Sequence, residues 1–234
     1  MDFKATTEQE AMQDSVRRLV ARTIRPLLDS QDRNHTLEKP HYLEILGKLA
    51  GMGLTAARLP RSLGGPGLEM IAYGMMIELL PAPIAVSLIA HEVTLSRLGA
   101  ECSQEQRQRL LPDLIAGRKI ACTGSTEPDT GSDPRGIKTR LSQKGGKLVL
   151  NGRKMWITNV SACDVMLATC LDQRTGASGS KVIMSCWSAR THPSRRMRLT
   201  PSASDKACSE NACSRIAKYR PRMSSKGRRA EPRC

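Results

Sequence analysis

The hydrophobic pattern of the chain changes its period once, near Lys119. Before that residue, apolar side chains recur three or four residues apart, as in Met12, Val16 and Val20. After it, short β-prone stretches follow one another, among them KIACTGST, KLVLNG, KMWITN and DVMLATCL. A helical period followed by a strand period is typical of two successive domains of different class. We therefore expect helices over residues 1–118 and a mainly antiparallel β-domain after them.

Local signals mark where several of these elements begin and end. Thr7-Glu-Gln-Glu10 and Ser103-Gln-Glu-Gln106 each predict a capping box at the start of a helix. Pro40 fits the first turn of another helix. In the second half, Gly145-Gly146 and Asn151-Gly152 predict tight turns between strands.

The composition changes a second time, near Ser185. The chain has a net charge of +15, and residues 185–234 hold 13 Lys/Arg against 3 Asp/Glu, a net charge of +10. Such a basic segment is compatible with a polyanion partner, so a nucleic-acid-binding protein acting through residues 185–234 is the alternative function. Cys208 and Cys213 stand five residues apart, a spacing that does not match zinc sites. We expect no bound metal.

The remaining composition indicates an intracellular environment. The first residues, MDFKATTEQE, contain no apolar run, and the longest apolar stretch, LLPAPIAVSLIA, is short and carries two prolines. Eight cysteines without a secretory leader are typical of free thiols in a reducing compartment. We expect a cytoplasmic protein with no membrane segment.

The segment richest in chemistry is IACTGSTEPDTGSDPRGIKT, residues 120–139. Ser125 and Thr126 offer hydroxyls and backbone N–H groups, Pro128 enforces a bend, and Gly131 permits close backbone approach. A strand entering such a loop can present several donors to one flat polar ligand or phosphate. A turn with self-satisfied side chains explains the same residue types. The residue types also leave the role of Trp156 undecided, because it fits a core position or the wall of a planar cofactor site.

Two long motifs resolve part of this ambiguity. TEPDTGSD at residues 126–133, followed by Lys138-Thr139 and then by NGRKMWITN at residues 151–159, resembles the signature of the acyl-CoA dehydrogenases. Upstream, TTEQE, LGKLAGMGL, LPRSLGGPG and EQRQRLLPDLIAGRKIAC occur in that family's order. The resemblance covers roughly residues 1–184.

The resemblance implies a helical N-terminal domain, a middle β-domain and a C-terminal helical bundle, with FAD between the last two. It implies α,β-dehydrogenation of an acyl-CoA thioester, in which a carboxylate takes the α-proton and flavin N5 accepts the β-hydride. It also implies acyl-CoA as substrate, an electron-transfer flavoprotein as partner, and homo-oligomers in intact relatives.

The resemblance also assigns site residues. Ser132 matches a substrate contact of the family. Seven positions match its cofactor-binding positions: Thr123, Ser125, Thr126, Gly131, Trp156, Ile157 and Thr158. The catalytic base of the family lies in the C-terminal bundle, so no catalytic residue is assigned in this chain. Glu127 is expected to order the backbone of its loop instead.

The resemblance ends near Met184, and our hypothesis is that a coding frameshift causes the change. Back-translation from Thr191 in the shifted frame permits a sequence similar to the family's next stretch. The expected fold is therefore α+β: an all-helical domain (1–118), a truncated antiparallel β-barrel-like domain (119–184) and a disordered tail (185–234). The expected function is a fragment of an FAD-dependent acyl-CoA dehydrogenase that is inactive alone.

Overall fold

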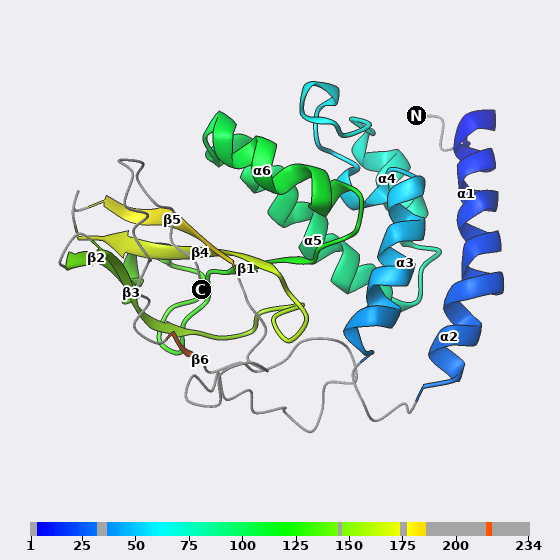
Figure 1. The fold of residues 1–234 in the computed structure, drawn as a ribbon. Helices are drawn as coiled ribbons and strands as arrows, with labels where there is room; N and C mark the ends of the chain where they lie inside the picture. The colour runs from blue at the N-terminus through cyan, green and yellow to red at the C-terminus, as the bar shows by residue number, and fades with distance from the viewer. Residues whose placement is uncertain (1–3, 32–36, 145–146, 174–176, 186–213, 217–234) are drawn as a thin grey trace. The chain divides into compact units, whose positions relative to one another are not determined.

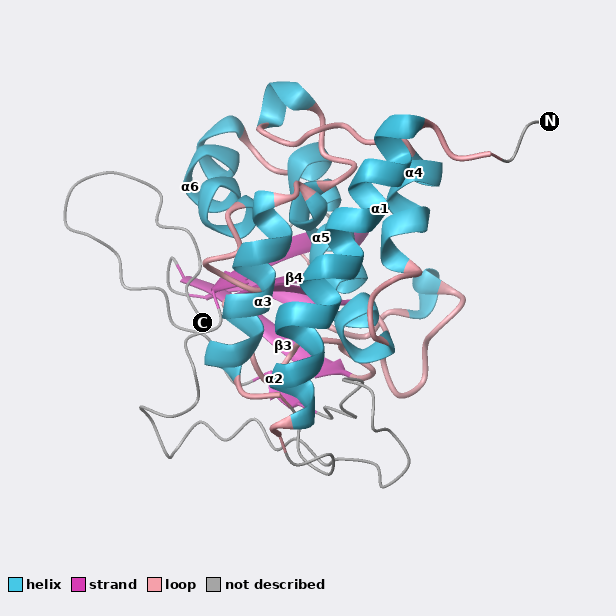
Figure 2. Cartoon of the chain, turned by 90° about the vertical axis from the view of Figure 1, so that its right-hand side faces the viewer, coloured by secondary structure: helices cyan, strands magenta, loops and turns pink. Residues whose placement is uncertain are grey.

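A computed structural model describes residues 4–31, 37–144, 147–173, 177–185 and 214–216 of the chain. The chain divides into two compact units, one ending at Ile120 and the other beginning at Ala121. The first contains the helices drawn in cyan in Figure 2, and the second contains the strands drawn in magenta.

The first unit is entirely helical in its described part. Its elements are α1 (Thr7–Leu19), the π-turn η1 (Val20–Ile24), α2 (Arg25–Asp29), α3 (Lys39–Gly51), the short 3₁₀ turns η2 (Leu54–Ala56) and η3 (Arg61–Leu63), α4 (Met70–Ile77), α5 (Ala82–Glu101) and α6 (Gln104–Ile115). Helix α5 packs against α6 and η2, and α1 packs against α4 (Figure 1). Leu88, Leu95 and Leu98 of α5 are buried, so this helix supplies much of the core of the unit.

The two predicted capping boxes have different outcomes. Ser103 accepts a hydrogen bond from the Gln106 N–H and Gln106 bonds back to the Ser103 N–H, as predicted. The first box is one residue earlier than predicted. Thr6 accepts from the Gln9 N–H and Gln9 returns a bond to the Thr6 N–H, because Thr6 has the extended backbone of an N-cap and Thr7 is already helical.

The second unit is a curled mixed sheet, shaped as a half-barrel. Its elements are β1 (Ala121–Gly124), the 3₁₀ turn η4 (Pro134–Gly136), β2 (Arg140–Lys144), β3 (Lys147–Lys154), β4 (Val165–Asp172), β5 (Ala177–Ser185) and β6 (Ser214–Ile216). The strand order is β1-β4-β2-β3-β6, with β5 also paired to β4. The predicted succession of a helical domain and a barrel-like β-domain is confirmed. The sheet itself is mixed, because β4 runs parallel to both β1 and β2.

Strand β4 organises the sheet along both of its edges. One edge pairs with β5 from Val165 to Asp172. The other edge is therefore shared: β1 pairs with residues 165–168, and β2 pairs with Leu171 and Asp172. Residues 125–139 leave the sheet between these two paired stretches. This segment, called the signature loop below, is thus anchored at both ends against one strand.

Two local predictions in this unit are wrong. Asn151-Gly152 is not a turn but lies inside β3. A Cβ built on Gly152 would lie 2.2 Å from Thr139 Oγ1, so glycine is needed there for the close approach of Thr139. KMWITN is not a strand: β3 ends at Lys154, and Trp156 and Asn159 have positive φ angles that break the strand. The Gly145-Gly146 turn falls outside the described residues.

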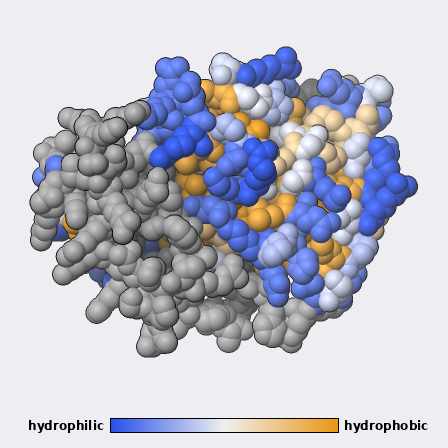
Figure 3. Space-filling model, viewed as in Figure 1, coloured by the Kyte–Doolittle hydropathy of each residue, from blue (hydrophilic) through white to orange (hydrophobic). Residues whose placement is uncertain are grey.

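Residues 186–213 and 217–234 also lie outside the described part, and with them most of the segment predicted to be disordered. From that segment, Ser214–Ile216 form β6, which pairs with the end of β3. In Figure 3, polar and apolar residues are interspersed over the visible face of the helical unit. Within the described ranges no helix is long and apolar enough to cross a membrane. No cluster of metal-ligating side chains occurs among these same residues.

Candidate functional site

A buried ion pair lies beneath the signature loop. Lys154, the last residue of β3, is fully buried, and its Nζ lies 2.8 Å from Glu127 Oε1 and 2.9 Å from the Ser125 carbonyl oxygen. Glu127 also accepts from the backbone N–H groups of Thr139 (Oε1, 2.9 Å) and Lys138 (Oε2, 2.7 Å). One carboxylate therefore joins the start of the loop, its end and β3. The expectation that Glu127 orders backbone is confirmed.

The electrostatics of Glu127 follow from these contacts. Burial by itself would raise the pKa of the Glu127 carboxyl, but the hydrogen bonds from Lys154, Thr139 and Lys138 outweigh burial and hold that pKa below its ordinary value. Glu127 is consequently a carboxylate at neutral pH, with both oxygens engaged. It is not available as a proton acceptor.

The first residues of the loop are fixed from two further directions. Ser125 Oγ lies 3.0 Å from Thr169 Oγ1 of β4, within hydrogen-bonding distance. The Met155 N–H donates to the Thr126 carbonyl oxygen at 3.0 Å. Ser125 and Thr126 both remain partly exposed. These contacts place the start of the signature loop beside the segment that follows β3.

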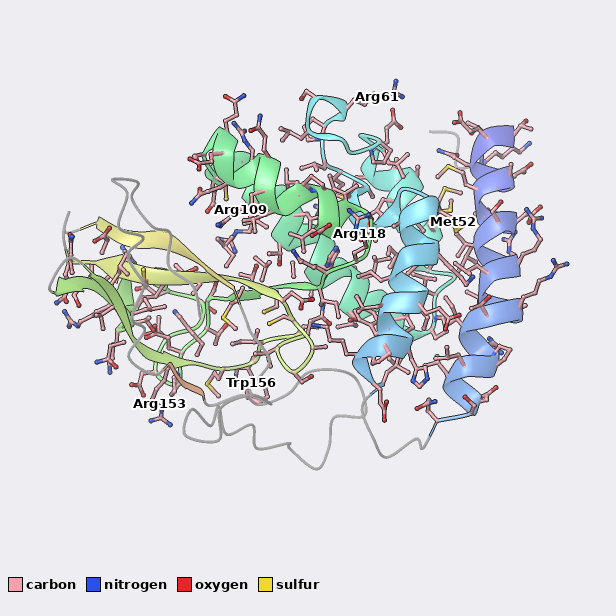
Figure 4. All side chains as sticks on the ribbon, in the orientation of Figure 1. Met52, Arg61, Arg109, Arg118, Arg153 and Trp156 are labelled. Atoms are coloured by element: carbon pink, nitrogen blue, oxygen red, sulfur yellow. The ribbon has the colours of Figure 1, made fainter. Side chains whose placement is uncertain are left out.

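Trp156 stands in that segment in an unfavourable conformation. Its φ is +57°, a left-handed value that is a clear outlier for a bulky residue. Its side chain is nevertheless 51% exposed, and Figure 4 labels it beyond the end of β3. Because the indole of Trp156 is half-exposed, packing in the core does not offset the backbone strain of this residue. Such strain is often retained where a ligand uses the side chain.

Asn159 holds the same turn from its other end. It also has a positive φ, +69°, and its side chain is buried with Nδ2 donating to the Ala121 carbonyl oxygen at 3.5 Å. Asparagine tolerates the left-handed region better than most residues. The turn that presents Trp156 is thereby tied to the first residue of β1.

The other predicted site residues differ in their exposure. Thr123 on β1 and Thr158 are partly exposed, and Gly131 and Ser132 are exposed at the tip of the signature loop. A Cβ built on Gly131 would meet no protein atom within 4 Å, so this glycine is not required by the packing of the described chain. Ile157 is buried, and any ligand contact from it would come from its backbone.

The structure thus gathers five of the predicted positions around β1 and the turn after β3, namely Thr123, Ser125, Thr126, Trp156 and Thr158. They combine partly exposed hydroxyls with one half-exposed indole. This set suits a flat ring with polar edges, because the indole offers a stacking surface and the hydroxyls and backbone offer hydrogen bonds. An isoalloxazine ring has these properties, so the residues present fit a flavin.

Sequence reasoning missed two residues of this arrangement, Lys154 and Thr169. Lys154 had a usable signal. Along β3, Leu150 and Lys154 are buried while Asn151 and Arg153 are exposed, so Lys154 occupies an inward position of an alternating strand. A lysine there requires a carboxylate partner, and Glu127 is one of three acids in the TEPDTGSD motif. Thr169 lies in an apolar run and carries no comparable signal.

Comparison with known proteins defines the family. Residues 6–118 match the acyl-CoA dehydrogenase N-terminal domain, and residues 122–203 match the acyl-CoA dehydrogenase middle domain. The second match continues past Met184, where the sequence resemblance was expected to end. A helical domain followed by this middle domain defines the class of the protein. The chain belongs to the acyl-CoA dehydrogenase family, whose members depend on FAD.

Three individual proteins illustrate the similarity. A probable acyl-CoA dehydrogenase, YngJ, from Bacillus subtilis is 30% identical over 72% of this chain and 44% of its own length. Glutaryl-CoA dehydrogenase from Mycobacterium smegmatis superposes with a TM-score of 0.71 and 28% identity, over 90% of this chain and 54% of its own. An acyl-CoA dehydrogenase from Bacillus anthracis, solved with FAD, superposes with a TM-score of 0.73 and 23% identity, over 98% of this chain and 38% of its own length. The chain thus spans about half or less of the length of these relatives.

Proposed function

We propose that this chain binds FAD through its β unit and supplies the flavin-side part of an acyl-CoA dehydrogenase site. The observation that carries the proposal is Trp156, half-exposed in a strained turn that backbone and side-chain bonds hold beside Ser125 and Thr126. The cofactor-binding roles assigned to Thr123, Ser125, Thr126, Gly131, Trp156, Ile157 and Thr158 belong to this proposal.

The reaction we propose for the complete site is α,β-dehydrogenation of an acyl-CoA thioester. The bound flavin supplies the hydride acceptor. The protein residues bind and orient: Ser132 at the loop tip contacts the substrate, and an electron-transfer flavoprotein reoxidises the cofactor.

We further propose that residues 1–234 do not complete this site by themselves. The matched part of the chain spans only 44% and 38% of the length of two relatives, and the buried, fully engaged carboxylate of Glu127 cannot act as the base. The expected result is weak FAD binding without acyl-CoA oxidation.

The test is an FAD titration of the purified chain in a Trp187→Phe background, which leaves Trp156 as the single tryptophan. Stacking of the isoalloxazine on the indole should quench Trp156 fluorescence saturably. Trp156→Phe should weaken FAD binding, followed by the flavin's own fluorescence. Arg153→Ala is the matched control, because Arg153 is exposed on β3 three residues earlier. No saturable quenching at any FAD concentration would refute the proposal.

A further inference from the structure

The charge of Lys154 is buried, and stabilisation of the fold does not by itself explain a buried lysine at this position. Replacing a buried ion pair by apolar residues of similar volume is often neutral or stabilising, so such pairs are weak evidence of a stabilising role. Yet Lys154 has no exposed surface, and its partner Glu127 is 5% exposed. A more specific role is indicated by what else the ammonium group contacts.

The ammonium of Lys154 donates to the carbonyl oxygen of Ser125 at 2.9 Å. That carbonyl belongs to the same peptide unit as the Thr126 N–H. A hydrogen bond from a cation is stronger than one between neutral groups, and it polarises the peptide that accepts it. The Thr126 N–H therefore becomes a better donor when Lys154 is charged and in place.

The same lysine fixes where that peptide lies. Lys154 holds Glu127, Glu127 accepts from the N–H groups of Lys138 and Thr139, and the Thr139 carbonyl accepts from the Leu171 N–H at 2.8 Å. The loop is thus bonded to β3 through Lys154 and to β4 through Leu171. Losing the ammonium would release Ser125 and one contact of Glu127 together.

We propose that Lys154 is a positioning residue: it holds the Ser125–Thr126 peptide in place and polarises the Thr126 N–H as a hydrogen-bond donor to bound flavin. The proposal rests on the proposed function, because it assigns Lys154 a role toward the cofactor without direct contact. It differs from a purely structural role in that loss of the ammonium affects the signature loop more than the rest of the β unit.

The experiment compares Lys154→Met with Lys138→Met in the Trp187→Phe background. Both variants remove one lysine charge close to Glu127, but Lys138 is exposed and its ammonium pairs with the exposed Asp129. Lys154→Gln is a second variant that keeps an uncharged N–H donor, for use if Lys154→Met does not fold. Three quantities are measured: amide hydrogen exchange, the ¹³C′ shift of Ser125, and FAD affinity.

For Lys154→Met we expect exchange at the Lys138 and Thr139 amides to accelerate about tenfold more than exchange at Leu167 in β4. A tenfold change corresponds to about 1.4 kcal/mol. The Ser125 ¹³C′ signal should move, and FAD binding should weaken about tenfold. Lys138→Met should leave the Ser125 ¹³C′ shift unchanged and FAD affinity within twofold of the parent.

Two results would overturn the role of Lys154. One is an equal acceleration of exchange at Lys138, Thr139 and Leu167, because the general loss of stability expected when Glu127 is left buried without its counter-charge affects all three amides alike. The other is an unchanged loop and unchanged FAD affinity. Absence of FAD binding by the parent chain would instead remove the proposed function, and the exchange comparison would still decide whether Lys154 positions the loop.

Discussion

Lys154 Nζ and Glu127 Oε1 lie 2.8 Å apart, and each side chain is almost completely removed from solvent. The two residues stand on opposite sides of the gap between β3 and the signature loop. They are 27 residues apart in the sequence, so the contact is a tertiary one. This buried ion pair therefore joins β3 to the signature loop of the candidate site.

Glu127→Gln should be strongly destabilising, because it leaves the Lys154 ammonium buried without a counter-charge. Breaking a buried pair from one side costs about 3–5 kcal/mol. We expect a loss of this size in the unfolding free energy of the β unit, measured by urea denaturation followed through Trp156 fluorescence in the Trp187→Phe background. Combining Glu127→Gln with Lys154→Met should recover part of the loss, since neither charge of the pair then remains. Equal stability of the single and double variants would contradict this account.

The sequence predicted the architecture well, because both periods of the hydrophobic pattern are local properties. The predicted change of period near Lys119 is only two residues from the boundary between the units after Ile120. The sequence-based prediction was wrong at positions where tertiary contacts determine the local backbone conformation. Gly152 resembles a turn glycine until Thr139 is placed against it. Trp156 has strand-like neighbours, but its left-handed backbone depends on bonds to Thr126 and on the turn ending at Asn159.

His91 of α5 predicts a pH dependence in the helical unit. It is fully buried, its Nε2–H donates to the Leu114 carbonyl oxygen of α6 at 3.1 Å, and burial lowers its pKa to about 4. The unfolded chain binds the proton with a pKa of about 6.5. Between these values the unfolded state holds more protons than the folded state, so stability falls as pH falls from about 6.5 to 4, by at most about 1.4 kcal/mol per pH unit.

The measurement is the urea midpoint of the helical circular-dichroism signal between pH 7 and pH 4.5. His91→Gln retains a donor toward Leu114 but cannot be protonated, so its midpoint should be lower at pH 7 and change less with pH. An identical pH dependence in His91→Gln and the parent would show that another group is responsible.

Gly152→Ala tests the close approach between β3 and the end of the signature loop. The added methyl would lie 2.2 Å from Thr139 Oγ1 and 2.6 Å from Thr139 Cα, so backbone as well as side chain must move. We expect a loss of about 1–3 kcal/mol in the unfolding free energy of the β unit, the usual range for overpacking. Gly131→Ala is the matched control: its Cβ meets nothing within 4 Å, and its φ is not in the left-handed region. Thermal melts of both variants should differ clearly, and equal melting temperatures would count against the packing argument.

We predict that Trp156 lowers the stability of its turn and increases the affinity for FAD. A left-handed backbone costs a non-glycine residue about 1–2 kcal/mol, whereas glycine adopts it freely. Glycine ordinarily costs about 0.5–1 kcal/mol relative to alanine through its larger entropy when unfolded. At +57° the relief of strain should outweigh that cost, so we expect Trp156→Gly to be about 0.5–1 kcal/mol more stable than Trp156→Ala. At Arg153, which lies in β3, the order of the Gly and Ala variants should be reversed.

Both Trp156 variants lack the indole, so both should bind FAD more weakly than the parent in a titration that follows flavin fluorescence. The stability order is measured by urea denaturation followed through circular dichroism. If Trp156→Gly is less stable than Trp156→Ala, the turn is not strained and the retention of Trp156 needs no ligand to explain it. If Trp156→Gly is more stable than both Trp156→Ala and the parent and binds less FAD, the parent retains a strained Trp156 because the indole binds the flavin, since losing this side chain would otherwise increase stability.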